Sequence, residues 1–158
     1  MSDASTHDFA GSIEGGVHRL PVRVYFEDTD SAGMVYHANY LHFMERARTE
    51  ILRACGVSLS ATIDAPGPES MRYAVSRCEI DYLQQSKLDD MLEVRTVSRG
   101  VGAAYFDVSQ DIFRGDTPVT RGDIRVVCLN ENGLPKRQPR DLVARLKDLL
   151  PVTPKEKA

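Results

Sequence analysis

Long apolar runs, an excess of one charge and closely spaced cysteines are all missing from this sequence. A membrane-spanning helix needs about 18 or more consecutive apolar residues, so no integral membrane segment is expected. The N-terminal stretch also lacks the basic and apolar regions of a secretory signal, which favours a cytoplasmic location. The composition, with 42% hydrophobic and 27% charged residues, is ordinary for a soluble globular protein.

The charge balance argues against polyanionic partners. The chain has 20 Lys and Arg against 23 Asp and Glu, and its net charge is −3. Both signs are spread along the sequence, so no extended positive field is available for nucleic acid or for an anionic membrane surface. A local cluster of cations that binds a phosphorylated small molecule is still compatible with this balance.

The three cysteines indicate neither a disulfide framework nor a metal site. Cys55, Cys78 and Cys128 are odd in number and far apart, and no Cys/His/Asp group has the spacing of metal ligands. Free cysteine is among the most buried residue types, so we expect three reduced thiols in the core. No metal is predicted.

The length of 158 residues suits a single domain. Residues 1–16 are polar and rich in Gly and Ser, and they predict a flexible N-terminal tail. The folded domain is expected to cover residues 17–151. Residues 152–158 then form a charged C-terminal tail.

One long amphipathic helix is the clearest element of the sequence. Apolar residues recur at helical spacing from Asn39 to Cys55, and His42 falls on the polar side, where we expect it to be solvated. Asn39 is a favoured N-cap residue and Gly56 a favoured residue after the last turn. Residues 57–70 contain two prolines and a glycine, which predicts a loop.

The other elements are strands and one short helix. Residues 17–26 predict a first strand, in which Pro21 suggests an edge position. Four more strands separated by short turns are expected at residues 71–84, 91–100, 103–114 and 117–130, and a helix at residues 139–150. The fold class is therefore α+β, with one helix facing an antiparallel meander. Apolar residues on both faces at 126–129 favour a sheet face that is buried against another subunit.

The connection between the first strand and the long helix is unusually polar. It contains Asp28, Asp30 and His37, together with Gly33, which can adopt positive φ. A helix start offers unpaired N–H groups and partial positive charge. An acid held beside these donors can act as base or nucleophile on an acyl carbon. The simpler alternative is that such residues serve local hydrogen bonding only.

The order of these residues resembles a known family. The pattern Asp-x-Asp-x-x-Gly-x-Val-x-His-x-x-Tyr is present as Asp28, Asp30, Gly33, Val35, His37 and Tyr40. It is similar to the opening segment of the 4-hydroxybenzoyl-CoA thioesterase-like hotdog proteins, and most similar to the bacterial acyl-CoA thioesterases encoded with the Tol-Pal system. A second stretch, CEIDYLQQSKLDDMLEVRT at residues 78–96, resembles the second and third strands of that family. The likeness runs from about Val22 to Leu129.

The resemblance implies a hotdog fold, a curved antiparallel sheet wrapped around the long helix and paired with a second protomer in a homodimer or homotetramer. It implies hydrolysis of acyl-CoA, with Asp30 as the catalytic carboxylate, either as nucleophile or as the base that activates water. The main oxyanion donor falls on His37, whose imidazole is a second candidate for assistance. Asp28 is expected to orient the turn rather than to react.

Substrate contacts follow from the same resemblance. It places contacts to coenzyme A at Arg99, Gly100 and Gly102. Arg72 and Arg77 are further cations that could meet the phosphates, although an exposed arginine is common on any surface. No separate cofactor is expected, because CoA is part of the substrate.

The acyl group would lie along the long helix, where Tyr40, Phe43 and Met44 either line its pocket or form ordinary core. The resemblance also suggests partners from lipid synthesis or the Tol-Pal system. The rival hypothesis is a non-catalytic protein that binds acyl-CoA or an acylated carrier protein, since fold alone does not fix chemistry.

Overall fold

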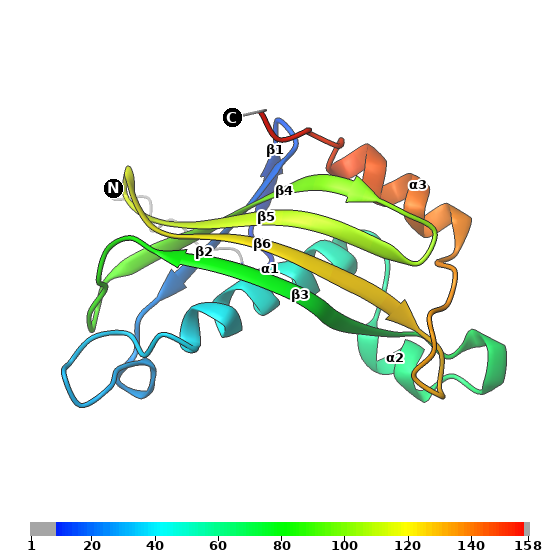
Figure 1. Ribbon diagram of the computed structural model, residues 1–158, viewed down its shortest axis with the longest axis horizontal. Helices are drawn as coiled ribbons and strands as arrows, with labels where there is room; N and C mark the ends of the chain where they lie inside the picture. Colours follow the sequence, from blue (N-terminus) through cyan, green and yellow to red (C-terminus); the bar gives the residue numbers. More distant parts are fainter. Residues whose placement is uncertain (1–8, 157–158) are drawn as a thin grey trace, which may run out of the picture.

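A curved antiparallel sheet of six strands lies across one long helix in the computed structural model, which describes residues 9–156 (Figure 1). The strand order is β1-β2-β4-β5-β6-β3. The strands are β1 (Ser12–Glu14), β2 (Val17–Arg23), β3 (Arg72–Tyr82), β4 (Met91–Val101), β5 (Tyr105–Arg114) and β6 (Thr117–Leu129). The helices are α1 (Asn39–Ala54), α2 (Leu59–Asp64) and α3 (Arg140–Leu149), with 3-10 turns at η1 (Phe26–Asp28) and η2 (Gly67–Glu69). This arrangement confirms the α+β hotdog fold. No helix within residues 9–156 is long and apolar enough to span a membrane.

The apolar side of α1 packs against the concave face of the sheet. Phe43, Met44 and Ala47 are 0% exposed. Gly122 on β6 allows the helix to approach, because a Cβ at this position would lie 3.0 Å from Met44 Cε. Side chains of β2, β4, β5 and β6 complete this core. The position of α1 therefore fixes where its N-terminal end meets the sheet.

The two ends of α1 differ from one another in how well they match the expected caps. Gly56 follows the helix with φ of +83°, as expected for a residue that reverses the chain. Asn39, however, is the first helical residue, and Ala38 occupies the N-cap position. The Asn39 side chain donates a hydrogen bond to the carbonyl of Asp28 (2.8 Å), so it ties the preceding connection to the helix.

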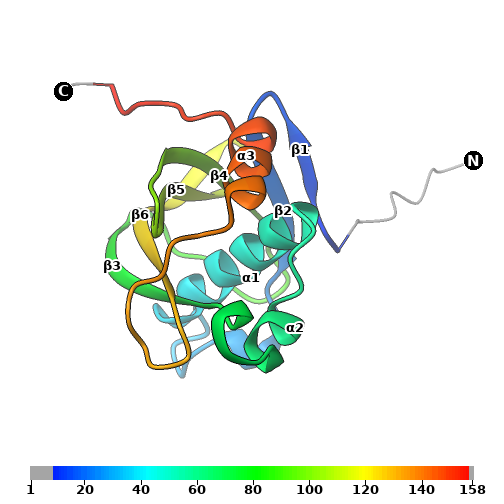
Figure 2. The same ribbon diagram turned by 90° about the vertical axis from the view of Figure 1, so that its right-hand side faces the viewer.

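A second apolar cluster joins α3 to the far end of α1. Helix α3 lies beside the C-terminal part of α1 (Figure 2). Leu142 and Leu146 of α3 pack with Ile51 of α1 and with Cys55, which follows it. Cys128 lies in the same cluster, so two of the three cysteines are buried as expected. The prediction is wrong for Cys78, which is exposed on the edge strand β3. An edge strand leaves side chains uncovered that would be buried in the middle of a sheet.

The N-terminal tail predicted for residues 1–16 contains ordered structure in its described part. Ser12–Glu14 forms β1, which pairs with β2 through a tight turn at Gly15 and Gly16, both at positive φ. Residues 1–8 lie outside the described residues. Pro21 of β2 has no partner residue in β1, so it lies at an edge of the sheet, as predicted.

The loop predicted for residues 57–70 contains a short helix, α2, and the turn η2. Leu59 packs against the main core, and the Met71 N–H donates to the carbonyl of Thr62 (3.1 Å). Six residues are too few to show a helical period, and tertiary contacts stabilise this helix.

The convex face of the sheet is mostly charged. Arg125 is paired with Asp107 (2.7 Å), and Arg19 with Glu93 (3.0 Å). Val126 and Cys128 face the core, whereas the half-buried side chains of the stretch are Val127 and Leu129. Apolar side chains therefore lie on both faces of the sheet at the end of β6.

His18 gives a pH dependence to folding. It is 1% exposed, and its Nε2–H donates to the carbonyl of Ala10 (2.8 Å), while Nδ1 is buried without a partner among the described residues. Burial lowers the pKa of His18 below its ordinary 6.5. The unfolded chain therefore takes up a proton on His18 at a higher pH than the folded chain does. The stability that the neutral, buried His18 contributes is complete above about pH 6.5 and is lost as the pH falls.

We therefore expect the urea midpoint to fall more steeply between about pH 7.5 and 5.5 in the native protein than in His18→Gln, which keeps a donor for the Ala10 carbonyl. His42→Gln, at an exposed position of α1, is the matched control and should retain the native slope. Equal slopes for His18→Gln and the native protein would contradict the assignment.

Candidate active site

Asp28 organises the connection between β2 and α1. Its side chain is 7% exposed, and Oδ2 accepts a hydrogen bond from the Tyr25 N–H (2.8 Å). Its backbone carbonyl accepts from the Tyr36 N–H (2.9 Å) and from Asn39 Nδ2 (2.8 Å). Its carboxylate and carbonyl are thus used to hold the connection against the helix start. This geometry agrees with the turn-orienting role expected for Asp28.

Asp30 lies at the tip of this connection and is exposed. Oδ1 accepts hydrogen bonds from the N–H groups of Ala32 (2.8 Å) and Met34 (3.4 Å). Gly33 has φ of +77°, which lets the chain turn back so that the Asp30 N–H donates to the Met34 carbonyl (2.8 Å). No described residue donates to Oδ2. One oxygen therefore anchors the carboxylate, and the other is available to a ligand.

The chain between Asp30 and α1 is held against the β3–β4 loop. The Val35 N–H donates to the Ser86 carbonyl (2.8 Å), and the Tyr82 hydroxyl donates to the His37 carbonyl (3.0 Å). The His37 side chain is exposed. The N–H groups of His37 and Ala38 donate to no other described residue. These free donors lie at the positive end of the helix dipole, a suitable place for an oxyanion.

Tyr40, Phe43 and Met44 are core residues in this chain. Tyr40 is 3% exposed, and its ring packs edge-on against Phe43 (6.1 Å between centroids) and beside Tyr82 (5.8 Å). Burial raises the pKa of the Tyr40 hydroxyl. The sequence left two roles open for these residues, lining an acyl pocket or forming the core, and within a single chain they form the core. The exposed His37 ring lies edge-on to Tyr82 (6.2 Å between centroids), beside the pair of Tyr40 and Tyr82.

Arg99 and Gly100 lie near the C-terminal end of β4 and Gly102 follows it, whereas the Asp30 connection meets the chain just before β4 begins. Gly100 follows a bulge in the pairing of β4 with β5. Gly102 is required by packing, because a Cβ there would lie 2.1 Å from the Tyr105 ring. Of the two other candidate cations, Arg77 is paired with Glu79 (3.0 Å) and Arg72 is exposed.

The predicted catalytic and CoA-binding residues are far apart within one chain. Met34 bridges to Lys87, just before β4 begins, whereas Gly102 follows the end of that strand. The 11 residues of β4 span roughly 35 Å of extended chain. One chain therefore does not bring Asp30 and Arg99 to the same small region.

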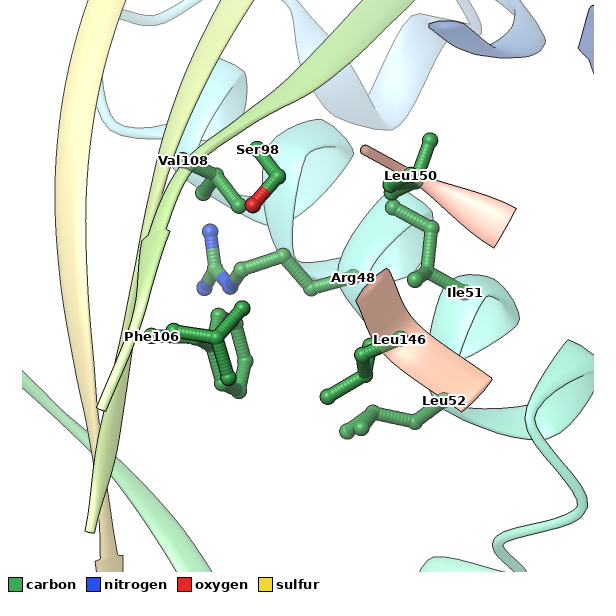
Figure 3. A pocket seen from close by; sticks show the side chains of 9 residues that line it. Arg48, Ile51, Leu52, Ser98, Phe106, Val108, Leu146 and Leu150 are labelled. Atoms are coloured by element: carbon green, nitrogen blue, oxygen red, sulfur yellow. The ribbon is translucent and has the colours of Figure 1, made fainter. Parts of the chain in front are cut away.

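Arg48 is a polar residue of the interior that sequence reasoning missed. It projects from α1 toward Ser98, Phe106 and Val108, beside a small apolar cavity closed by α3 (Figure 3). Its Nη1–H donates to Gln110 Oε1 (2.8 Å), and burial lowers the pKa of the guanidinium. The cavity volume of about 20 Å³ has room for little more than one water molecule, so it is not an acyl pocket in this conformation.

The fold and the polar residues before α1 place the chain in the class of hotdog proteins that have an acidic turn before the central helix. The model of the Thioesterase-like superfamily matches residues 24–146. The chain belongs to this superfamily and is an enzyme of the thioesterase class.

Individual relatives agree with this assignment. Acyl-CoA thioesterase YbgC of Haemophilus influenzae is 39% identical over 111 residues, covering 70% of this chain and 79% of that protein. Acyl-CoA thioester hydrolase YbgC of Escherichia coli O6:H1 is 37% identical over 131 residues, covering 82% and 95%. The crystal structure of a probable thioesterase from Bartonella henselae superposes with a TM-score of 0.74 at 32% identity, covering 78% of this chain and 99% of the other.

Proposed function

We propose that this protein hydrolyses acyl-CoA thioesters to a free acid and CoA. The observation that carries the proposal is the turn around Asp30, in which one carboxylate oxygen is anchored and the other is free of described donors, next to the N–H groups at the start of α1. The names of the YbgC relatives support acyl-CoA as the substrate class. The proposal keeps the cytosolic location predicted from the sequence, and partners from lipid synthesis or the Tol-Pal system stay predictions.

The chemistry needs few groups. The thioester carbonyl oxygen accepts hydrogen bonds from the backbone N–H groups at His37 and Ala38, which stabilise the negative charge that develops on it. Asp30 Oδ2 either attacks the carbonyl carbon or removes a proton from the attacking water. The C–S bond then breaks and the thiolate of CoA takes up a proton, which leaves the free acid when water is the nucleophile. When Asp30 attacks directly, water hydrolyses the resulting anhydride.

Two protomers supply each complete site in this proposal. The outer edge of β3 is unpaired in the described chain, and β3 runs from the Arg99 end of the sheet to the Asp30 end. Antiparallel pairing of two β3 edges about a twofold axis would bring the Asp30 end of one protomer beside the Arg99 end of its partner's sheet. A homodimer, or a homotetramer built from such dimers, would thus overcome the separation of roughly 35 Å along β4.

Mixing two impaired variants tests this shared site. We expect Asp30→Asn and Arg99→Ala, each impaired alone, to regain activity when they are unfolded and refolded together. Random pairing makes half of the dimers mixed, and one of their two sites is intact, so roughly a quarter of the native kcat/KM should return. Native protein refolded with Asp30→Asn gives the control value, about half. Activity no higher than the mean of the two separate variants would show that each site lies within one chain.

Release of free thiol across a panel of acyl-CoA substrates tests the function itself. A hydrolase releases CoA continuously, with saturation at a KM for its preferred acyl group. A binding or scaffold protein would show saturable binding of the same compounds without turnover, and this result would overturn the proposed function.

A further inference from the structure

The segment that follows α3 returns to the sheet and contacts Arg99. The chain leaves α3 at Leu149 and crosses the convex face near β4, β5 and β6 (Figures 1 and 2). The Thr153 N–H donates to the Ser98 carbonyl (2.8 Å), so the segment adds a hydrogen bond to the end of β4. Lys155 forms an ion pair with Asp123 of β6. We call residues 152–156 the C-terminal strap.

The strap and one serine fix the Arg99 side chain. Arg99 Nη1–H donates to the carbonyls of Thr153 (2.8 Å) and Pro154 (3.3 Å), and Nε–H donates to Ser109 Oγ (2.8 Å). Nη2 donates to no described residue. The guanidinium thus has three acceptors within the described chain, and all three are neutral oxygen atoms.

Asp123 lies in the same groove as Arg99, and both of its carboxylate oxygens are bound by other side chains. Asp123 Oδ1 accepts a hydrogen bond from Ser109 (2.6 Å), and Oδ2 is bound by Lys155. Burial opposes ionisation of Asp123, yet the hydrogen bonds from Lys155 and Ser109 hold its pKa below the ordinary value. Lys155 thereby offsets the charge of Asp123, which would otherwise compete for the guanidinium. Among the described residues, no carboxylate forms a hydrogen bond or an ion pair with Arg99 and Nη2 is free, although the negative charges of Asp123 and Asp111 act on the guanidinium.

The same groove holds other charges. It has a volume of about 590 Å³ and is open to solvent. Its remaining charged residues are Glu79, Asp81, Asp111, Arg121 and Glu156. None of these described side chains forms a salt bridge with Arg99. The strap is therefore the main constraint on the orientation of this side chain.

We infer that the C-terminal strap is a positioning element that presents Arg99 to a phosphate of CoA, an inference that rests on the proposed function. An unrestrained arginine loses rotamer freedom when it binds a ligand, and holding it in one orientation beforehand removes that loss. Because Arg99 would bind a phosphate of CoA and not the thioester, the strap acts on substrate affinity and not on the chemical step.

The test compares four proteins: the full chain, Arg99→Ala, a chain that ends at Pro151, and that shorter chain carrying Arg99→Ala. Each is assayed with one acyl-CoA and with the same acyl group on pantetheine, which lacks the nucleotide phosphates. We expect removal of the strap to raise KM for acyl-CoA by roughly three- to tenfold with kcat nearly unchanged. KM for acyl-pantetheine should not change. Once Arg99 is replaced by alanine, removal of the strap should add nothing.

Two further variants keep the result interpretable. Ser109→Ala removes the acceptor of Arg99 Nε–H and should raise KM for acyl-CoA in the same way without shortening the chain. Arg125→Ala, on the same face and paired with Asp107, should leave KM unchanged. The inference is overturned if KM for acyl-CoA is unchanged or lower in both the shortened chain and Ser109→Ala. The proposed function still stands in that case, provided that the full chain hydrolyses acyl-CoA. Absence of hydrolysis by the full chain would overturn the proposed function, and this inference with it.

Discussion

Asp30→Asn is expected to lower kcat by roughly 10²- to 10⁴-fold, the usual contribution of a positioned acid or base. The amide oxygen can still accept the hydrogen bonds from Ala32 and Met34, so the turn should persist. The variant loses only the negative charge and the basicity of the second oxygen. Binding of CoA and the melting temperature should stay close to those of the native protein, as measured by calorimetry and circular dichroism.

Glu27→Gln is the matched control for this substitution. Glu27 is an exposed acid in the same connection, and its side chain forms no ion pair or hydrogen bond within the described residues. Its amide variant should retain nearly full turnover. Full turnover by a correctly folded Asp30→Asn protein, or an equal loss in Glu27→Gln, would refute the role assigned to Asp30.

Phe43→Ala is expected to reduce the free energy of unfolding by about 3–5 kcal/mol, the usual effect of removing a large core aromatic side chain. Phe43 is 0% exposed, between the Tyr40 ring and the sheet, where neighbouring side chains cannot collapse fully into the space. Such a loss is a large part of the stability of a typical domain. Urea unfolding at neutral pH measures it.

His42→Ala provides the comparison on the same helix. His42 is exposed, so its substitution should change the free energy of unfolding by less than about 0.5 kcal/mol. A loss below about 1 kcal/mol in Phe43→Ala would show that this side chain faces a pocket and is not part of the packed core.

The sequence predicted α1 and the long strands well, because their apolar patterns extend over ten or more residues. It failed for short elements that depend on tertiary contacts. The hairpin of β1 and β2 could have been found from Gly15 and Gly16, since two glycines between short strand-like stretches favour a tight turn. Asn39 was misplaced by one position because its side chain binds the Asp28 carbonyl and not a helix N–H group.

In the candidate site, too, the sequence predicted the local features but not those that depend on tertiary structure. Local spacing was enough to place Asp28, Asp30 and His37 in one connection before α1, and the structure adds how each is held. The distance between Asp30 and Arg99 depends on the length and direction of β4, which residue identity does not reveal. The contact between Arg99 and Thr153 joins residues 54 positions apart, so no local pattern predicts it.

A crystal structure of Asp30→Asn with a bound acyl-CoA would measure the geometry of the reacting group directly. We predict that the thioester carbonyl oxygen lies about 2.7–3.1 Å from the backbone nitrogen of His37 or Ala38. The side-chain amide introduced at position 30 should lie about 3–3.5 Å from the carbonyl carbon or from a water molecule in contact with it. A thioester bound away from the start of α1, with the substituted side chain facing open solvent, would contradict this account.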